Sequence, residues 1–358
     1  MVAGMVRRDQ LDSLRFLAIS FVLFDHCVKP VWFGPGNVSV RLFLLISGFL
    51  ITRTFVGKDH RQRGDSARLL ASFYGRRSLR IWPLFYTLLI VLLWTDSISR
   101  RQFVYHGLFL TNLLQAHSGD LDHPWFLAHL WTLSVQEQFY LVWPALLLAL
   151  TDRGRLRVIG LAITTAVSFR AIMWATGHTG VTLGVWPFAS FDALGLGALL
   201  AAFPRLVPDD VRTGRIIIGS SLLCVAFALS GIEFLSLVVV PTLWLLPLLL
   251  LTRTVFAGIR GPIGKLLELR PLIFLGRISL GIYLLHLPVW YGFTVLPEAW
   301  ISRWLVRPGW PAFLIVSAAT FLMAAAFWYV VESPLQRLRK YLTYEDATAK
   351  AKLAAQGS

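Results

Sequence analysis

The sequence is poor in charged residues, above all acidic ones, and in cysteine. Only 15% of its 358 residues are Asp, Glu, Lys or Arg, against about 25% in an ordinary soluble protein, so an ordinary soluble domain is excluded. The two cysteines, Cys27 and Cys224, lie in apolar stretches, which excludes a disulfide framework and a zinc-binding spacing. Disorder is also excluded, because 13% of the residues are aromatic and disordered chains contain few aromatic side chains.

Apolar residues are abundant instead: they form 56% of the chain, and the mean hydropathy is +0.65. A helix that crosses a bilayer needs about 20 mostly apolar residues. Candidate segments occur at about 14–33, 38–56, 78–95, 130–150, 157–176, 186–203, 215–231, 234–252, 272–296 and 310–331. A shorter apolar stretch at 102–116 is expected to be interfacial or re-entrant. The predicted fold class is all-α, a polytopic membrane bundle of about ten transmembrane helices.

The distribution of basic residues gives this bundle an orientation. A net charge of +15 can indicate a nucleic-acid partner. With a cytoplasmic N-terminus, however, 25 of the 34 basic residues fall in cytoplasmic pieces and 4 in external pieces, as the positive-inside rule requires. We therefore predict both termini in the cytoplasm, no nucleic-acid partner, and a multi-pass protein of the plasma membrane (the inner membrane of a bacterium) surrounded by membrane lipid. Residues 1–340 would form the membrane domain and 341–358 a polar cytoplasmic tail.

Ionisable residues inside the predicted spans are candidates for function, because such groups are costly in lipid. They are Arg15, Asp25, His26, Lys29, Arg41, Glu137, Arg170, Asp192, Arg277 and His286. Three of them, Lys29, Arg41 and Arg277, lie close to segment ends. For these three we favour a structural interpretation, in which the side chain extends to the membrane interface.

Arg15 and His26 are eleven residues apart, which corresponds to about three helical turns and about 16 Å. They therefore share one helix face, with the arginine near the cytoplasmic end and the imidazole deeper. This arrangement suits a ligand that has an anionic head and a reactive tip. The alternative is that His26 pairs with Asp25 or Lys29 as polar contacts in the bundle interior.

Two further sets of polar residues lie just before an apolar run or at its start. Arg77 and Arg80 are three residues apart, share a helix face, and together suit a phosphate group; the alternative is a positive-inside anchor. Glu137 and Tyr140 form a polar patch early in a predicted helix. The carboxylate there can orient a histidine or act as a base, or it can pair with an arginine such as Arg170.

Three motifs lie near the N-terminus: LDSLRFLAISFVLFDH, RLFLLISGFLITR and RRSLRIWPLF. Together they resemble motifs of the acyltransferase 3 family of integral membrane acyltransferases. LDSLRFLAISFVLFDH, which includes Asp12, resembles the family's Arg-x10-His signature and aligns Arg15 and His26 with it. RLFLLISGFLITR resembles its Phe-x-x-Ser-Gly-Phe-x-Ile element, through Ser47 and Gly48. RRSLRIWPLF resembles its Arg-x-x-Arg-x-x-Pro element, through Arg77 and Arg80.

The resemblance continues through the rest of the chain in family order, from about residue 9 to 340. HLWTLSVQEQFYLVWP, with Trp131, Glu137 and Tyr140, resembles the Trp-Ser-Leu-x-x-Glu-Glu-Gln-Phe-Tyr-x-x-x-Pro element. FDALGLGALLA, with Asp192, resembles the Asp-x-Leu-x-x-Gly pattern. GRISLGIYLLHLPV and YVVESPLQRL resemble the last two elements and contain His286 and Glu332.

The sequence departs from the family pattern at several positions. Thr132 replaces the usual Ser and keeps the hydroxyl, Gln136 replaces the first Glu of a pair, and Leu44 stands where an aromatic residue is common. The sequence ends soon after the tenth segment, without the hydrolase-like extracytoplasmic domain that some members carry. We therefore do not expect the subgroup whose polysaccharide acetylation uses that domain.

The resemblance implies transfer of an acyl group, often acetyl, from cytoplasmic acyl-CoA to a hydroxyl of a sugar, cell-surface glycan, lipid-linked saccharide or secondary metabolite. Acyl-CoA is then a co-substrate, with no permanently bound cofactor and no metal. Arg15, Arg77 and Arg80 would bind the phosphates of the donor. His26 would be the general base or carry the acyl group transiently. Glu137 would orient or stabilise it, and Ser47 or the Ser47–Gly48 backbone would stabilise an oxyanion.

Other interpretations were compatible with parts of the sequence. A transporter or channel without acyl-transfer chemistry would also have about ten helices and interior charges, but no inverted repeat is found. A different class of membrane acyltransferase would be centred on His286 instead of His26. The spacing from His117 to Asp122 matches a glycerolipid acyltransferase motif, but it lies in a hydrophilic loop and is interpreted as chance.

Overall fold

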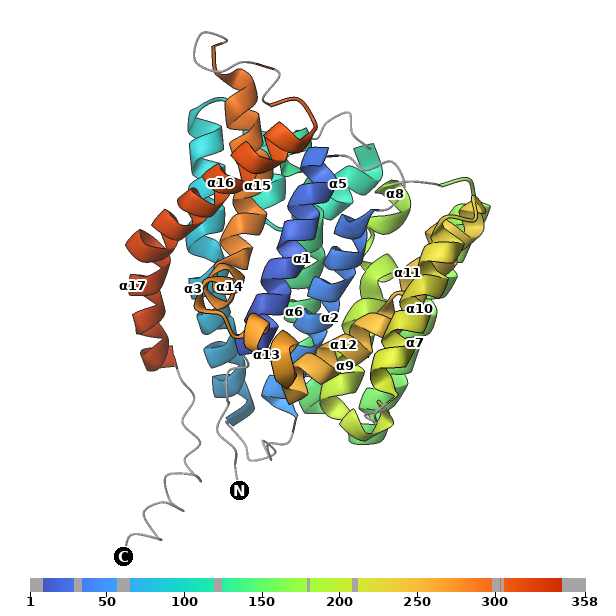
Figure 1. The fold of residues 1–358 in the computed structure, drawn as a ribbon. Coiled ribbons are helices and arrows are strands. Elements are labelled where there is room, and N and C mark those ends of the chain that lie inside the picture. Colours follow the sequence, from blue (N-terminus) through green and yellow to red (C-terminus); the bar gives the residue numbers. More distant parts are fainter. Residues whose placement is uncertain are drawn as a thin grey trace, which may run out of the picture.

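The computed structural model describes residues 9–28, 34–56, 65–118, 124–178, 181–207, 212–297, 303 and 306–342. These residues form helices without any strand, so the all-α prediction is confirmed for the described part of the chain. Most of the long helices run roughly along one common direction (Figure 1).

The longer helices of the bundle are α1 (Asp9–Val28), α2 (Pro35–Phe55), α3 (Asp65–Trp94), α6 (Trp131–Ala149), α7 (Asp152–Ala175), α9 (Phe191–Ala202), α10 (Thr213–Ala228), α12 (Leu245–Ala257), α15 (Ser279–Val295) and α16 (Trp310–Phe327). Shorter helical pieces connect or extend them: α4 (Arg100–Gly107), α5 (Thr111–Ser118), η1 (Trp125–Leu130), α8 (Val181–Gly184), η2 (Pro187–Ser190), η3 (Pro204–Leu206), η4 (Leu235–Val239), α11 (Val240–Leu243), α13 (Gly261–Leu267), α14 (Arg270–Arg277), η6 (Trp328–Glu332), α17 (Ser333–Gln336) and η7 (Arg337–Leu342).

Each predicted segment falls on a helix or on consecutive helical pieces, but their form differs in places. The stretch 102–116 consists of two short helices, α4 and α5. The segment predicted at 272–296 is two helices, α14 and α15, which meet at a bend of 68°. At the end of α14, Arg277 is paired with Asp9 of α1 at 3.2 Å.

Five helices of the described chain are long and apolar enough to cross a membrane, or six if α14 and α15 form one span. They begin at Pro35, Ser66, Asp152, Leu235 and Trp310. Two further apolar helices, at 187–202 and 213–228, are shorter. The total of ten spans and the cytoplasmic placement of both termini stay predictions.

Helices α2 and α9 cross at close range in the centre of the bundle. A Cβ atom on Gly48 would lie 2.1 Å from the carbonyl oxygen of Leu194, and one on Gly197 would lie 2.0 Å from that of Leu45. Only glycine therefore allows this contact between the two backbones. The crossing brings Asp192 of α9 next to Arg41 of α2.

Apolar side chains from α1, α3, α15, α16 and η1 form a large buried cluster in one part of the bundle. A second cluster joins α1, α2, α9 and α12, and a third joins α2, α3, α6 and α7. Helix α1 thus lies between two apolar cores. The polar side chains of α1 therefore lie where these two apolar cores meet.

Candidate active site

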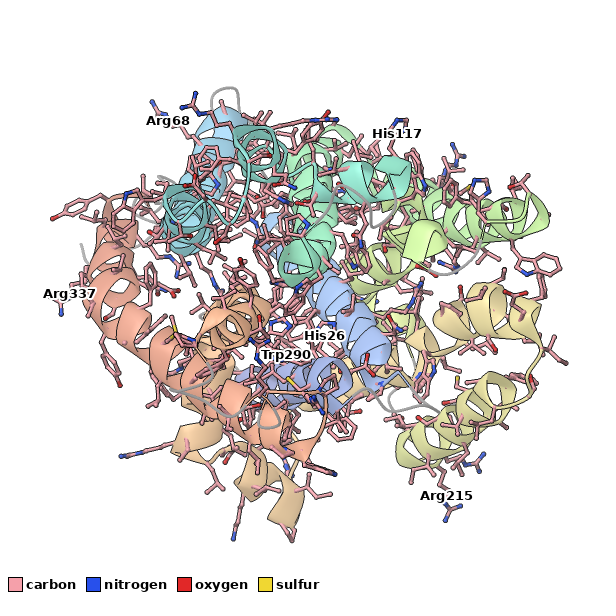
Figure 2. The ribbon with its side chains drawn as sticks, turned by 90° about the horizontal axis from the view of Figure 1, so that it is seen from above. His26, Arg68, His117, Arg215, Trp290 and Arg337 are labelled. Atoms are coloured by element: carbon pink, nitrogen blue, oxygen red, sulfur yellow. The ribbon has the colours of Figure 1, made fainter. Side chains whose placement is uncertain are left out.

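Two histidines meet in the interior of the bundle, although 260 positions separate them in the sequence. His26 lies in the last turn of α1, and His286 lies in the middle of α15 and is fully buried. Nδ1 of His26 is 2.9 Å from Nε2 of His286, and the two rings are stacked with their centres 5.1 Å apart. Figure 2 shows His26 beside Trp290 near the middle of the molecule, while Arg215 and Arg337 extend from its periphery.

The partners of His286 determine which nitrogen atoms carry protons. Nδ1 of His286 is 2.7 Å from the carbonyl oxygen of Tyr283; a carbonyl only accepts, so this nitrogen must be the donor. In the neutral ring Nε2 is then an acceptor, and the contact between the two rings requires Nδ1–H of His26 as donor. The lone pair of neutral His26 is consequently on Nε2.

Residues from η1 and α6 hold this pair in place. The ring of His129 is 4.7 Å from that of His286, in an edge-to-face arrangement. The Tyr283 hydroxyl contacts the backbone carbonyl of His129 and lies 2.5 Å from the hydroxyl of Thr132. His129 and Tyr283 were not among the predicted site residues; the available signal for Tyr283 is its position three residues before His286, on the same helix face.

Arg15, Arg77 and Arg80 line one cavity of about 110 Å³, here called the arginine cavity. Ser47 and Tyr140 also line it, and no acidic residue of the described chain does. Three predicted donor-binding residues, which come from α1 and α3, are thus brought together. The cavity wall is strongly cationic and faces apolar side chains of α2 and α15, as a ligand with phosphates and an apolar portion requires.

His26 lines a different cavity of about 610 Å³, here called the histidine cavity, together with Trp125, Trp290, Arg303 and Arg307. Since Arg15 and His26 lie on the same straight helix, the two cavities lie at different depths along α1. Tyr283, whose carbonyl group accepts the His286 hydrogen bond, lines the arginine cavity. The histidine pair therefore lies between the two cavities.

Glu137 contacts Arg77, and no contact joins it to His26 among the described residues. Its carboxylate accepts a 3.0 Å hydrogen bond from Nε of Arg77, whose guanidinium lies 3.2 Å from the ring centre of Tyr140. The alternative that Glu137 pairs with Arg170 is wrong, because Arg170 pairs with Asp192. The hypothesis that Glu137 orients His26 has no contact to support it among the described residues, because the carboxylate is engaged by Arg77.

Ser47 and Gly48 are neighbours in α2 but face different surroundings. The Ser47 hydroxyl donates to Oε1 of Gln136 over 3.3 Å, and the Tyr140 hydroxyl donates to the same oxygen over 3.1 Å. Gln136, which replaces a family glutamate, thus connects two residues of the cavity wall. Gly48 instead packs against α9 inside a continuous helix. Its backbone amide lies inside the helix and is engaged there by helix hydrogen bonding, so the geometry gives no support to an oxyanion role for that amide.

Glu332 and Asp12 lie near arginines at the same end of the bundle. Glu332 is buried, accepts a 2.8 Å hydrogen bond from Gln336, and interacts electrostatically with Arg80 and Arg15. Asp12 is buried at the start of α1, with a carboxylate oxygen 3.7 Å from Nε of Arg277. Glu332 therefore balances part of the positive charge around the arginine cavity.

Three residues near segment ends were predicted to extend to the interface. Arg277 is 36% exposed, as that interpretation requires. Arg41 differs: it is only 15% exposed and donates to Asp192 over 3.0 Å, because the tight crossing of α2 and α9 brings the carboxylate to it. Lys29 lies outside the described residues.

The remaining candidates lie away from the histidine pair. Trp131 lines a third cavity that also contains Arg41 and Arg170. His117 lies at the edge of the molecule (Figure 2), and Asp122 is outside the described residues. Within the described part of the chain, no group of three or more His, Cys, Asp or Glu side chains is placed to hold a metal ion.

Residues 8–329 match the model of a protein family described as an acyltransferase domain. Similar curated proteins are the peptidoglycan O-acetyltransferase OatA of Listeria monocytogenes, 28% identical over 91% of this chain and 55% of the relative, and the O-acetyltransferase OatA of Staphylococcus aureus, 25% identical over 91% and 57%. A putative peptidoglycan O-acetyltransferase of Bacillus subtilis, YrhL, is 26% identical over 91% and 54%.

The chain spans about half the length of the curated relatives it matches. No solved structure matches it. The family match covers nearly the whole chain and confirms the resemblance carried by the sequence motifs. The chain therefore belongs to the acyltransferase 3 family, and residues 8–329 form its acyltransferase domain.

Proposed function

We propose that this protein is an integral membrane O-acyltransferase that moves an acyl group, acetyl in the first instance, from acyl-CoA to a hydroxyl of a glycan. The observation that carries the proposal is the position of His26. It lies at the histidine cavity, while Arg15 on the same helix lies at the arginine cavity. A base between a cationic donor cavity and a separate acceptor cavity is what direct acyl transfer requires.

The arginine cavity supplies the donor site in this proposal. Arg15, Arg77 and Arg80 bind the phosphates of coenzyme A through charge-assisted hydrogen bonds. Glu137 holds Arg77 through its Nε atom and leaves the terminal nitrogens of that guanidinium to the ligand. Placement of this cavity on the cytoplasmic side follows from the positive-inside bias of the sequence.

His26 acts as the general base, and His286 is a positioning residue. Nε2 of His26 takes the proton of the acceptor hydroxyl as that oxygen attacks the thioester carbonyl carbon. The carbon–sulfur bond then breaks, the proton passes to the departing thiolate, and the products are an ester and free coenzyme A. His286 accepts Nδ1–H of His26 and so keeps the reactive nitrogen unprotonated before attack.

A glycan acceptor is favoured by the relatives, two of which are named as peptidoglycan O-acetyltransferases. Lipid-linked saccharides and secondary metabolites are the other hydroxyl acceptors of this proposal. The plasma membrane is the proposed location, because acyl-CoA is a cytoplasmic donor and the proposed glycan is at the cell surface.

The test is mass spectrometry of envelope glycans and metabolites from a deletion strain that carries the wild-type gene, His26→Ala or His117→Ala. Acetyl or larger acyl adducts should disappear in the deletion strain and with His26→Ala, and return with the wild type and with His117→Ala. His117 is the matched control, because it is a histidine at the edge of the molecule. Unchanged adducts with a normally inserted His26→Ala protein would contradict the proposal.

A further inference from the structure

A third cavity, here called the side cavity, has a volume of about 430 Å³ and lies between α2, α6, α7, α10 and α11. Its wall contains the polar or aromatic side chains of Asn37, Arg41, Trp131, Arg170, Ser236 and Trp244. None of the described residues that line it is acidic. It is separate from the histidine pair, and the proposed transfer reaction does not use it.

The formal charges of the groups behind this wall do not sum to zero. Asp192 is fully buried and is shared by two arginines, at 3.0 Å from Nη1 of Arg41 and 2.7 Å from Nη2 of Arg170. Asp192 and Arg170 are the charged groups that act on Arg41 among the described residues. Two guanidinium groups and one carboxylate leave one positive charge at the side cavity. An uncompensated charge at such a site is costly, and an anion in the cavity would compensate it.

The two arginines differ in the donors they have left. Arg170 is 1% exposed and also contacts the carbonyl groups of Ala189 and Val238 and the hydroxyl of Thr242. Arg41 is 15% exposed, and within the described chain its side chain donates a hydrogen bond to Asp192 only. Its Nε and Nη2 atoms therefore remain for a ligand. Arg170 acts mainly as the buried support of Asp192.

The rest of the wall indicates what kind of anion fits. Trp131 and Trp244 give flat apolar surfaces, and Asn37 and Ser236 add hydrogen-bonding groups. Aromatic surfaces with a few directed polar groups are typical of sites for small amphipathic ligands. We propose that the side cavity binds an acidic saccharide, a sugar that carries one carboxylate or phosphate, with its anionic group on Arg41 and its ring against the tryptophans.

This inference deepens the proposed function, on which it rests for the identification of saccharides as acceptors. Val40 of α2 lines both the side cavity and the arginine cavity. A saccharide in the side cavity would therefore lie on the other side of Val40 from the proposed donor site. The side cavity would be a second saccharide site for sugars that carry a negative charge, distinct from the histidine cavity at which the acceptor hydroxyl reacts.

Binding of three sugars with the same ring tests the inference: glucose, glucuronate and glucose 6-phosphate. The full-length protein in phosphatidylcholine nanodiscs is titrated calorimetrically with each sugar, without acyl-CoA. At least one acidic sugar should bind about tenfold more tightly than glucose, which corresponds to one charge-assisted contact of about 1.4 kcal/mol. The acidic sugar that binds more tightly shows whether the site prefers carboxylate or phosphate.

Arg41→Gln should remove this preference, and Arg41→Lys should keep part of it. The Gln variant is expected to fold, because Asp192 retains Arg170 as its partner. Arg53→Gln is the matched control: Arg53 is an arginine of the same helix, stacked on Phe256 outside the side cavity. Its preference for acidic sugars should equal that of the wild type.

Equal binding of all three sugars, or equal loss with Arg41→Gln and Arg53→Gln, would overturn the inference. A second arm replaces one third of the phosphatidylcholine by phosphatidylglycerol. If this lipid abolishes acidic-sugar binding, or if it alone stabilises the wild type but not Arg41→Gln, the site takes a lipid headgroup and the saccharide assignment is wrong. Acyl transfer that requires His26 without acidic-sugar binding would leave the proposed function standing and refute only this inference.

Discussion

Two buried polar clusters in different parts of the bundle are built from opposite chemistry. The histidine cluster joins α1 to α15 through His26 and His286, which are coupled by neutral hydrogen bonds. The arginine cluster joins α2, α7 and α9 through Arg41, Arg170 and Asp192. Figure 1 shows α7 on the opposite side of α2 from α15. Imidazoles exchange protons near neutral pH, whereas guanidinium groups stay charged. The first cluster therefore suits chemistry, and the second suits binding and structural support.

The largest expected effect on stability comes from removing the single carboxylate of the arginine cluster. Asp192→Asn leaves two buried arginines without a counter-charge and should lower the free energy of unfolding by about 3–5 kcal/mol. Thermal unfolding in detergent measures this loss. Asp152→Asn is the control, because Asp152 is 78% exposed and paired with Arg155; it should change stability by less than about 1 kcal/mol. If both variants lost a similar amount of stability, the conclusion that the arginine cluster supports the structure would be wrong.

In the histidine cluster, substitution should affect rate more than stability. His286→Leu removes the acceptor for Nδ1–H of His26 and should lower kcat by on the order of 100-fold, within the usual range for a general base and its support. His286→Gln offers an acceptor oxygen, so its kcat should be at least tenfold higher than that of His286→Leu. KM for acyl-CoA should be unchanged in both variants. Steady-state kinetics decides. Equal kcat values for Leu and Gln variants of equal thermal stability would reduce His286 to a packing residue.

A smaller effect is expected at the arginine cavity, because several cations share the donor there. Arg80→Ala should raise KM for acyl-CoA about tenfold, or about 1.4 kcal/mol, with little change in kcat, since Arg15 and Arg77 remain in the cavity wall. Arg68→Ala, an exposed arginine of the same helix (Figure 2), is the control and should leave KM unchanged. An unchanged KM for Arg80→Ala would remove this residue from the donor site.

The positions of the helices followed from the sequence, because long apolar runs bounded by charges leave few alternatives to helix. The ends did not. In α1 the described helix already includes Asp9 and Asp12, which lie before the apolar run and contact Arg277 of α14. The bend after α14 did not follow from hydropathy either, because the residues on both sides of Arg277 are apolar.

The roles of the candidate residues stay predictions, and several of their contacts did not follow from the sequence. His26 and His286 were both singled out, yet only the packing of α1 against α15 brings them to 2.9 Å. Arg41 was expected at the interface because hydropathy along one segment contains no information about Asp192, which lies 151 positions away. The family motif led to the hypothesis that Glu137 acts on His26, whereas its position on α6 brings its carboxylate into contact with Arg77. Partners at such separations depend on helix packing.

The central claim is that His26 transfers a proton during acyl transfer. Membranes that contain the wild type, His26→Ala or His117→Ala at equal protein levels would receive acetyl-CoA together with an acceptor saccharide, and released coenzyme A would be followed with a thiol reagent. We predict release above the background of membranes without the protein for the wild type and His117→Ala, and release at background for His26→Ala. Wild-type release by His26→Ala would contradict the claim, and no release by the wild type would favour a transporter or channel.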